Sequence, residues 1–118
     1  MLDNVFEMSM LYDFYGDLLP QKQKEILGLY YGDNLSLSEI AVEYNLTRQG
    51  IHETLKRSER KLRNFESKLK LIEKFFQEEE IIKSIKEDIE HLIVKRRNDR
   101  DLVVKLKEFK DAILMLNG

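Results

Sequence analysis

The sequence predicts an all-α protein, and three observations lead to that prediction. Apolar residues recur at spacings of three and four along most of the 118 residues. Glycine and proline are confined almost entirely to the first half, and residues 51–117 contain neither. No stretch alternates apolar and polar residues over a useful length, as a half-buried β-strand would. We therefore expect a helix-turn-helix bundle with a C-terminal helical extension.

The first two helices are placed by capping and punctuation residues. The first is expected to begin at Asp3 or Asn4, whose side chains can cap exposed amides, and to stop at Gly16. Its apolar side chains are Val5, Phe6, Met8, Leu11, Phe14 and Tyr15. Pro20 suits the first turn of a helix, because its missing amide hydrogen would have no partner there. A second helix is therefore expected over residues 20–31.

A helix-turn-helix is expected next, over residues 37–56. Ser36 and Glu39 have the spacing of a capping box, which opens a short helix over residues 37–44. Asn45 tolerates the left-handed backbone of a sharp turn, and Thr47 can cap a further helix that begins at Arg48. The expected buried positions are Leu37, Ile40, Ala41, Tyr44, Leu46, Ile51 and Leu55. Ala41 is informative because two closely crossing helices require a small side chain at their contact.

Charge points to the second of these helices as the functional one. Residues 47–70 carry eight basic and three acidic side chains, a net +5, whereas residues 1–46 carry a net −6. The exposed side chains expected to bind nucleic acid are Thr47, Arg48, Gln49, His52, Glu53, Lys56, Arg57 and Arg60. Arginine can pair with guanine and glutamine with adenine, and a capped helix N-terminus can hold a phosphate.

Several neighbouring residues refine this interpretation. Lys61 and Arg63 are expected to extend the basic surface toward backbone phosphates. Glu53 and Glu59 are expected to lie within that surface and to weaken its field. Gly50 is expected to mark the close approach of another backbone, that of the preceding helix or of nucleic acid. The alternative is a solvated basic helix whose helix-turn-helix serves packing alone.

The C-terminal half predicts further helices. Leu55, Leu62, Leu69 and Phe76 recur every seven residues, and a second apolar stripe follows after a change of phase. The polar run at 96–99 is expected to separate two antiparallel helices. We expect residues 1–66 to form the helix-turn-helix domain and residues 67–118 a helical tail. A tail that exposes its apolar stripe indicates a homodimer.

Other classes of protein and site are disfavoured. The chain has no cysteine, no apolar run near the ~18 residues of a membrane span, and no basic signal-peptide start. We therefore expect a cytoplasmic protein without membrane insertion. Glu87 and His91 are only two candidate metal ligands, so no metal, cofactor or catalytic site is expected. The basic run from Lys95 to Arg100 could hold an anion or complement a helix dipole.

The sequence resembles known families in identifiable runs. The stretch from Leu19-Pro20-Gln21 to Leu62, with Ser36-Leu37-Ser38-Glu39-Ile40-Ala41 and Thr47-Arg48-Gln49-Gly50-Ile51, resembles region 4 of bacterial sigma factors. The whole chain, with Leu11-Tyr12-Asp13-Phe14-Tyr15 ahead of that stretch, resembles the small YlxM-type (p13-like) proteins of Gram-positive bacteria, the UPF0122 family. No segment that could open promoter DNA precedes the first helix, so a complete sigma factor is not expected.

This resemblance implies a fold, a site and a set of partners. The fold would be like sigma region 4, and the contact positions would fall on Arg48, Gln49, His52 and Glu53. A regulatory role in the signal recognition particle pathway is implied, since genes for the particle's GTPases neighbour those of the family. The implied partners are DNA or RNA, including the particle's RNA, and the particle's GTPase. The alternative is a non-catalytic interaction module that binds that GTPase or a second copy of itself.

Overall fold

The computed structural model describes residues 4–116, and every regular element within them is helical. The predicted all-α fold is confirmed. The chain forms two compact units, Met1–Ile72 and Glu73–Gly118, which we describe separately. The expected domain division between residues 66 and 67 stays a prediction.

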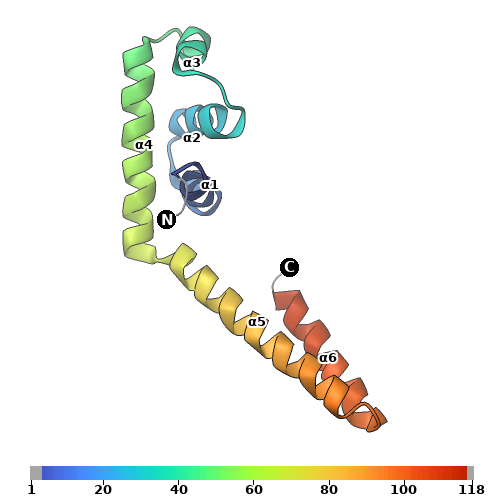
Figure 1. Cartoon of the computed structure of the whole chain (residues 1–118). Helices are drawn as coiled ribbons and strands as arrows, with labels where there is room; N and C mark the ends of the chain where they lie inside the picture. Colours follow the sequence, from blue (N-terminus) through green and yellow to red (C-terminus); the bar gives the residue numbers. More distant parts are fainter. Residues whose placement is uncertain (1–3, 117–118) are drawn as a thin grey trace. The chain divides into compact units, whose positions relative to one another are not determined.

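The first unit packs three short helices against one long one (Figure 1). Its helices are α1 (Asn4–Tyr15), α2 (Gln21–Leu27), α3 (Leu37–Tyr44) and α4 (Arg48–Leu69), with short turns η1 (Gly16–Leu18) and η2 (Gly28–Gly32). All three short helices contact α4, which runs past each of them in turn. The buried core between them consists of Met8, Leu11, Tyr15, Leu19, Ile26, Leu27, Ile40, Ala41, Ile51, Leu55 and Leu62.

The first two helices follow the prediction with local differences. The proposed cap Asp3 lies outside the described residues. Val5 and Phe6 are exposed rather than buried, because the core begins one turn later at Met8. The second helix is α-helical only to Leu27 and continues as a π-turn, Gly28–Gly32. The glycine at each end of that turn weakens the preference for a regular α-helix.

The helix-turn-helix forms from the predicted local signals. The Ser36 hydroxyl accepts a hydrogen bond from the Glu39 amide (3.1 Å), and the Glu39 carboxylate accepts one from the Ser36 amide (3.0 Å). Asn45 adopts a left-handed backbone with φ of 55°, and Thr47 caps α4 by accepting from the Gly50 amide at 2.9 Å. These contacts confirm both caps and the turn.

Two details of this motif differ from or narrow the prediction. Leu46, expected to be buried, is 40% exposed, because the turn carries it away from the contact between α3 and α4. At Gly50 no atom of α3 lies within 4 Å of where a side chain would begin, so the expected approach of the preceding helix is not found, while that of nucleic acid stays a prediction. A methyl group at position 50 would instead lie 3.1 Å from the capping oxygen of Thr47, so glycine leaves room for the cap.

The second unit contains most of α5 (Leu71–Lys95) and all of α6 (Arg100–Leu116). These helices lie side by side and antiparallel, and the predicted break at residues 96–99 is confirmed (Figure 1). Ile89 and Leu106 are the buried apolar side chains of this hairpin within the described residues. An ion pair of 2.9 Å between Lys110 and Glu90 also joins the two helices.

The junction between α4 and α5 was not predicted. Lys70 has a left-handed backbone with φ of 56°, which ends α4 without glycine or proline. The fully buried Tyr15 hydroxyl donates to the Glu66 carboxylate at 2.5 Å and accepts from the Leu71 amide at 3.0 Å. The same carboxylate accepts from the Ile72 amide at 3.0 Å. Tyr15 of α1 and Glu66 of α4 therefore accept the hydrogen bonds of the first two amides of α5.

Candidate nucleic-acid interface

The outer face of α4 is set by the residues on its inner face. Ile51, Leu55, Ser58 and Leu62 are buried at spacings of four, three and four, which places them along one side of the helix. Ser58 donates to the Thr54 carbonyl at 2.8 Å, so its hydroxyl is satisfied within the helix. The side opposite this stripe carries no packing helix and faces solvent.

All eight predicted site residues are exposed, but they do not form a single cluster. Six of them line one shallow depression on the outer face of α4: Gln49, His52, Glu53, Lys56, Arg57 and Arg60. Arg48 lies about 100° around the helix from Gln49, and Thr47 precedes the first turn. The Thr47 oxygen caps the helix, while its hydroxyl hydrogen remains available to a phosphate. The N-terminus and the outer face of α4 are thus two adjoining surfaces.

The two glutamates expected within the basic surface differ. Glu53 is exposed there, and its carboxylate lies 3.4 Å from the Gln49 amide nitrogen. Glu59 is buried rather than exposed within that surface, and it accepts a hydrogen bond from the Tyr31 hydroxyl at 2.9 Å. Its other carboxylate oxygen lies 3.7 Å from the Lys56 ammonium, so it still weakens the field there as predicted. Burial and the bond to Glu59 raise the pKa of Tyr31 well above its usual range. Glu59 therefore fastens α4 to η2, a role for which the sequence carried no signal.

The basic surface is also shorter than predicted. Lys61 is half-buried and donates to the Gln23 side chain of α2 at 3.3 Å. Arg63 pairs with Glu7 of α1 and donates to Asn4 at 3.3 Å. Both side chains bind neighbouring helices because they lie on the flanks of α4, beside the buried stripe. Four cations remain on the candidate interface: Arg48, Lys56, Arg57 and Arg60.

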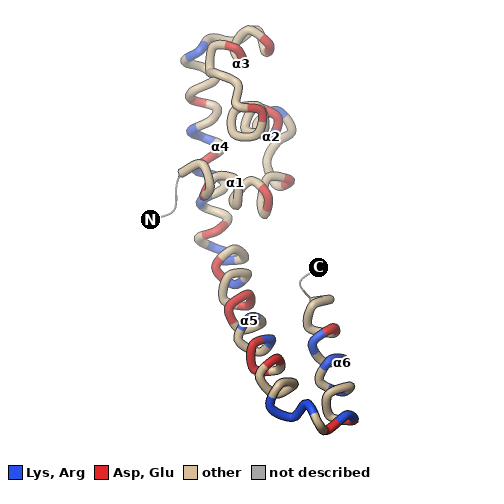
Figure 2. The backbone as a smooth tube through the Cα atoms, turned by 45° about the vertical axis from the view of Figure 1, so that its right-hand side comes forward, with Lys and Arg blue, Asp and Glu red and all other residues tan. Residues whose placement is uncertain are grey.

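The two signs of charge are segregated within the first unit. Figure 2 shows acidic positions on α1 and α3, which carry no basic residue, with most basic positions of the unit on α4. The helix α2 carries two lysines and one glutamate. Glu25, Asp33 and Glu43 share a depression formed by α2, η2 and α3. Cations gathered on one helix raise the local field for an anion, although the chain as a whole has a net charge of −2.

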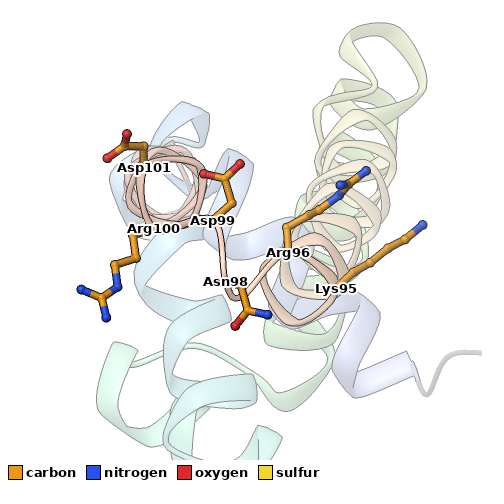
Figure 3. Close-up of a pocket in the computed structure, with 6 residues that line it drawn as sticks. All are labelled: Lys95, Arg96, Asn98, Asp99, Arg100 and Asp101. Carbon is orange, nitrogen blue, oxygen red and sulfur yellow. The ribbon is translucent and has the colours of Figure 1, made fainter.

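The second basic run does not form an anion site of the same kind. Lys95, Arg96, Asn98, Asp99, Arg100 and Asp101 surround an open hollow at the tip of the α5–α6 hairpin (Figure 3). In that view Lys95 and Arg96 extend to one side and Arg100 to the other, so their charges do not converge. The Asp99 carboxylate caps α6 by accepting from the Leu102 amide at 3.2 Å. Capping therefore accounts for part of this cluster.

Comparison with known proteins agrees with this geometry. The family described as "Putative helix-turn-helix protein, YlxM / p13 like" (UPF0122) matches residues 2–108. The chain belongs to this family. A UPF0122 protein of Clostridium acetobutylicum is 42% identical over 106 residues, which cover 90% of each chain. One from a Geobacillus species is 36% identical over 111 residues, 94% of this chain and 98% of its own. One from Desulforamulus reducens is 53% identical over 72 residues, 61% of this chain and 62% of its own.

The helix-turn-helix formed by α3 and α4 is the feature that this chain shares with the description of the UPF0122 family. Within residues 4–116, no three His, Cys, Asp or Glu side chains are grouped to hold a metal ion. None of the described helices is both long and apolar enough to cross a bilayer.

Proposed function

We propose that this UPF0122 protein is a cytoplasmic regulator that binds nucleic acid through the N-terminus and outer face of α4. The observation that carries the proposal is the exposed set of four cations and Gln49 on the second helix of a capped helix-turn-helix. The eight interface residues are Thr47, Arg48, Gln49, His52, Glu53, Lys56, Arg57 and Arg60.

Duplex DNA is the favoured ligand on geometric grounds. The major groove of B-form DNA admits an α-helix, whereas the major groove of A-form RNA is too narrow and deep for side chains to read. In a sigma region 4-like approach, the first turn of α4 enters the groove. Arg48 and Gln49 then reach base edges, and the Thr47 hydroxyl donates to a phosphate. Lys56, Arg57 and Arg60 follow along the helix and neutralise phosphates.

Glu53 gives this interface a selective element. A carboxylate beside three cations repels phosphates and lowers nonspecific affinity, while it can accept a hydrogen bond from the amino group of cytosine. Its neighbour Gln49, 3.4 Å away, can orient that carboxylate. The arrangement supports a protein that binds a limited set of sites rather than any polyanion.

The cellular role that we propose follows the family resemblance. It implies regulation in the signal recognition particle pathway, with the particle's RNA as an alternative ligand. RNA contact would run through phosphates and unpaired loops rather than base pairs in a groove. DNA and RNA are therefore separate arms of the test.

Fluorescence anisotropy with labelled duplex DNA and labelled signal recognition particle RNA, at several salt concentrations, tests the proposal. The three cations assigned to phosphates, Lys56, Arg57 and Arg60, predict a salt slope of about 2.7 on duplex DNA, since each neutralised phosphate contributes about 0.9. Arg48→Ala combined with Lys56→Ala should weaken binding on the order of 10–100-fold and lower the slope by roughly 1, because Lys56 contacts a phosphate and Arg48 a base.

Lys83→Ala combined with Lys107→Ala is the matched control, because it removes two exposed cations from α5 and α6. Its affinity should stay within about twofold of the unaltered protein. Equal weakening by both double variants would refute the assigned face. Tight binding to the RNA alone would replace DNA as the ligand and leave the face assigned.

A second candidate function is protein binding, and the charge segregation favours it. The acidic helix α3 carries Val42, which is 83% exposed and could contact a partner such as the signal recognition particle GTPase. A pull-down of that GTPase at high salt separates the candidates, because an apolar contact persists while a phosphate-driven one weakens steeply. Val42→Glu should abolish such a pull-down and leave nucleic-acid binding unchanged.

A further inference from the structure

The α5–α6 hairpin exposes an apolar surface that its own two helices do not cover. Among the described residues, Ile89 and Leu106 are its buried apolar side chains, at 7% exposure each, whereas six other large apolar side chains on the same helices remain 37–78% exposed. These six are Ile81, Ile85, Leu92, Leu102, Phe109 and Leu116, which we call the hairpin face. Two packed helices that bury so little are expected to require a further apolar contact.

The six residues lie on one side of the hairpin. At about 100° per residue, the three on α5 lie roughly 40–80° to one rotational side of Ile89. The three on α6 lie roughly 40–80° to the same rotational side of Leu106. Because the helices run antiparallel with Ile89 and Leu106 turned inward, equal rotations bring both stripes onto a common face. The hairpin face is therefore continuous across the two helices.

Its size suits a pair of identical chains. The exposed fractions of the six side chains add up to about three whole side chains, on the order of 500 Å² per copy. Two copies placed face to face would bury about 1,000 Å² from these residues alone, which is where specific interfaces begin. A monomer rarely leaves an apolar patch of this size in water without a use for it.

The charges along the rim of the face fix how the copies would be arranged. The outer rim of α5 carries Asp88 and then Lys95, and the outer rim of α6 carries Asp101 and then Lys105. The helices are antiparallel, and the short turn of residues 96–99 places Lys95 about level with Arg100. If α5 of one copy covers α6 of the other, Asp88 meets Lys105 and Lys95 meets Asp101. Both rim contacts then join opposite charges.

The position of Lys105 agrees with this arrangement. Its ammonium group lies 5.6 Å from the centre of the Phe109 ring and 3.4 Å from the Glu108 carboxylate. A cation is thus held at the edge of the hairpin face, beside its largest side chain, where an incoming carboxylate would meet it.

We propose that two copies of this chain join through the hairpin face and form an antiparallel four-helix bundle with α5 of each copy on α6 of the other. The bundle buries Ile85, Phe109 and their four companions as a shared core. This dimer uses a different unit of the chain from the nucleic-acid interface on α4, so either proposal can fail without the other.

Sedimentation of the full chain tests this proposal by mass. The unaltered protein should sediment at twice the mass of one chain. Ile85→Glu with Phe109→Glu should return it to one chain and raise the dissociation constant at least about 100-fold, because it buries charges within an apolar core. Both side chains are at least 41% exposed in one copy, so the helices themselves should persist by circular dichroism.

The matched control is Val94→Glu with Val104→Glu, which adds the same charge at positions that are 65% and 58% exposed and point away from the hairpin face. The control should keep the two-chain mass. A single-chain mass for the unaltered protein up to about 100 μM, or equal dissociation of both variants, would overturn the proposal.

Chemical cross-linking tests the arrangement. A carbodiimide that joins carboxylates to amines should link Asp88 of one chain to Lys105 of another. A mixture of chains labelled with ¹⁴N and ¹⁵N identifies such links as intermolecular by mass. Links between Asp88 and Lys105 confined to single chains, in a protein of two-chain mass, would overturn the proposed α5-on-α6 arrangement.

Discussion

Removing one hydroxyl group from Tyr15 should loosen the junction between α4 and α5. The Tyr15 side chain is fully buried, and its oxygen joins the Glu66 carboxylate (2.5 Å) to the Leu71 amide (3.0 Å). Tyr15→Phe keeps the ring, which packs against Phe65 with the ring centres 6.0 Å apart. The variant therefore removes two hydrogen bonds and little packing.

The expected loss follows from the charges involved. A hydrogen bond to an ionised carboxylate contributes about 1.5–3 kcal/mol, and a neutral one about 0.5–1.5 kcal/mol. The Leu71 side chain is 44% exposed, so water can partly replace the phenol at its amide. Glu66 keeps its bond to the Ile72 amide. We expect Tyr15→Phe to lower the free energy of unfolding of the first unit by about 2 kcal/mol, or roughly 8–16 °C in melting temperature.

Urea unfolding monitored by circular dichroism measures the free energy, and hydrogen exchange by NMR locates the effect. Exchange at the Leu71 amide should accelerate more than exchange in the middle of α4. Tyr12→Phe is the matched control, because Tyr12 is half-buried on the same helix and takes no part in the junction. A change below about 0.5 kcal/mol for Tyr15→Phe, or an equal loss for Tyr12→Phe, would refute the reasoning.

Three further predictions concern the turn, the cap and alkaline pH. Asn45→Ala should lower the free energy of unfolding by about 1–2 kcal/mol, because its φ is 55°, whereas Asn45→Gly should change it little; urea titration compares them. Thr47→Ala should cost about 1 kcal/mol in the same assay, and Thr47→Ser much less, since serine keeps the capping oxygen. Burial, followed by hydrogen bonds to carboxylates, raises the pKa of Tyr15, Tyr31 and Tyr44. Their contribution to stability should be complete below about pH 10 and lost as the pH rises through the higher folded pKa values, which unfolding at pH 8 and pH 11 would detect. Equal stability at these two pH values would contradict this prediction.

Much of the fold was predictable because local chemistry determines it. Ser36 and Glu39 satisfy each other's amides, and Thr47 satisfies an amide at the start of α4, whatever lies beyond. The all-α fold, both helices of the motif and the break at residues 96–99 follow from such signals and from apolar spacing. Lys70 is the exception, since it adopts a left-handed backbone without being glycine or asparagine. The Tyr15 and Glu66 contacts that stabilise that turn join residues 51 positions apart, which no local pattern reveals.

The candidate interface was predictable only where α4 has no neighbour. Positions opposite the buried stripe are exposed in any helix that packs on one side, so Gln49, Lys56 and Arg60 were placed correctly in solvent. Flanking positions depend on which helices lie beside them. Glu59 therefore binds Tyr31 from a buried position while it still pairs with Lys56, and Lys61 and Arg63 bind α2 and α1 instead of extending the basic surface. Packing buries Glu59 beside Lys56 and takes two positive charges from the far end of the outer face. The remaining field is concentrated over the first three to four turns of α4, where a helix entering a groove makes its contacts.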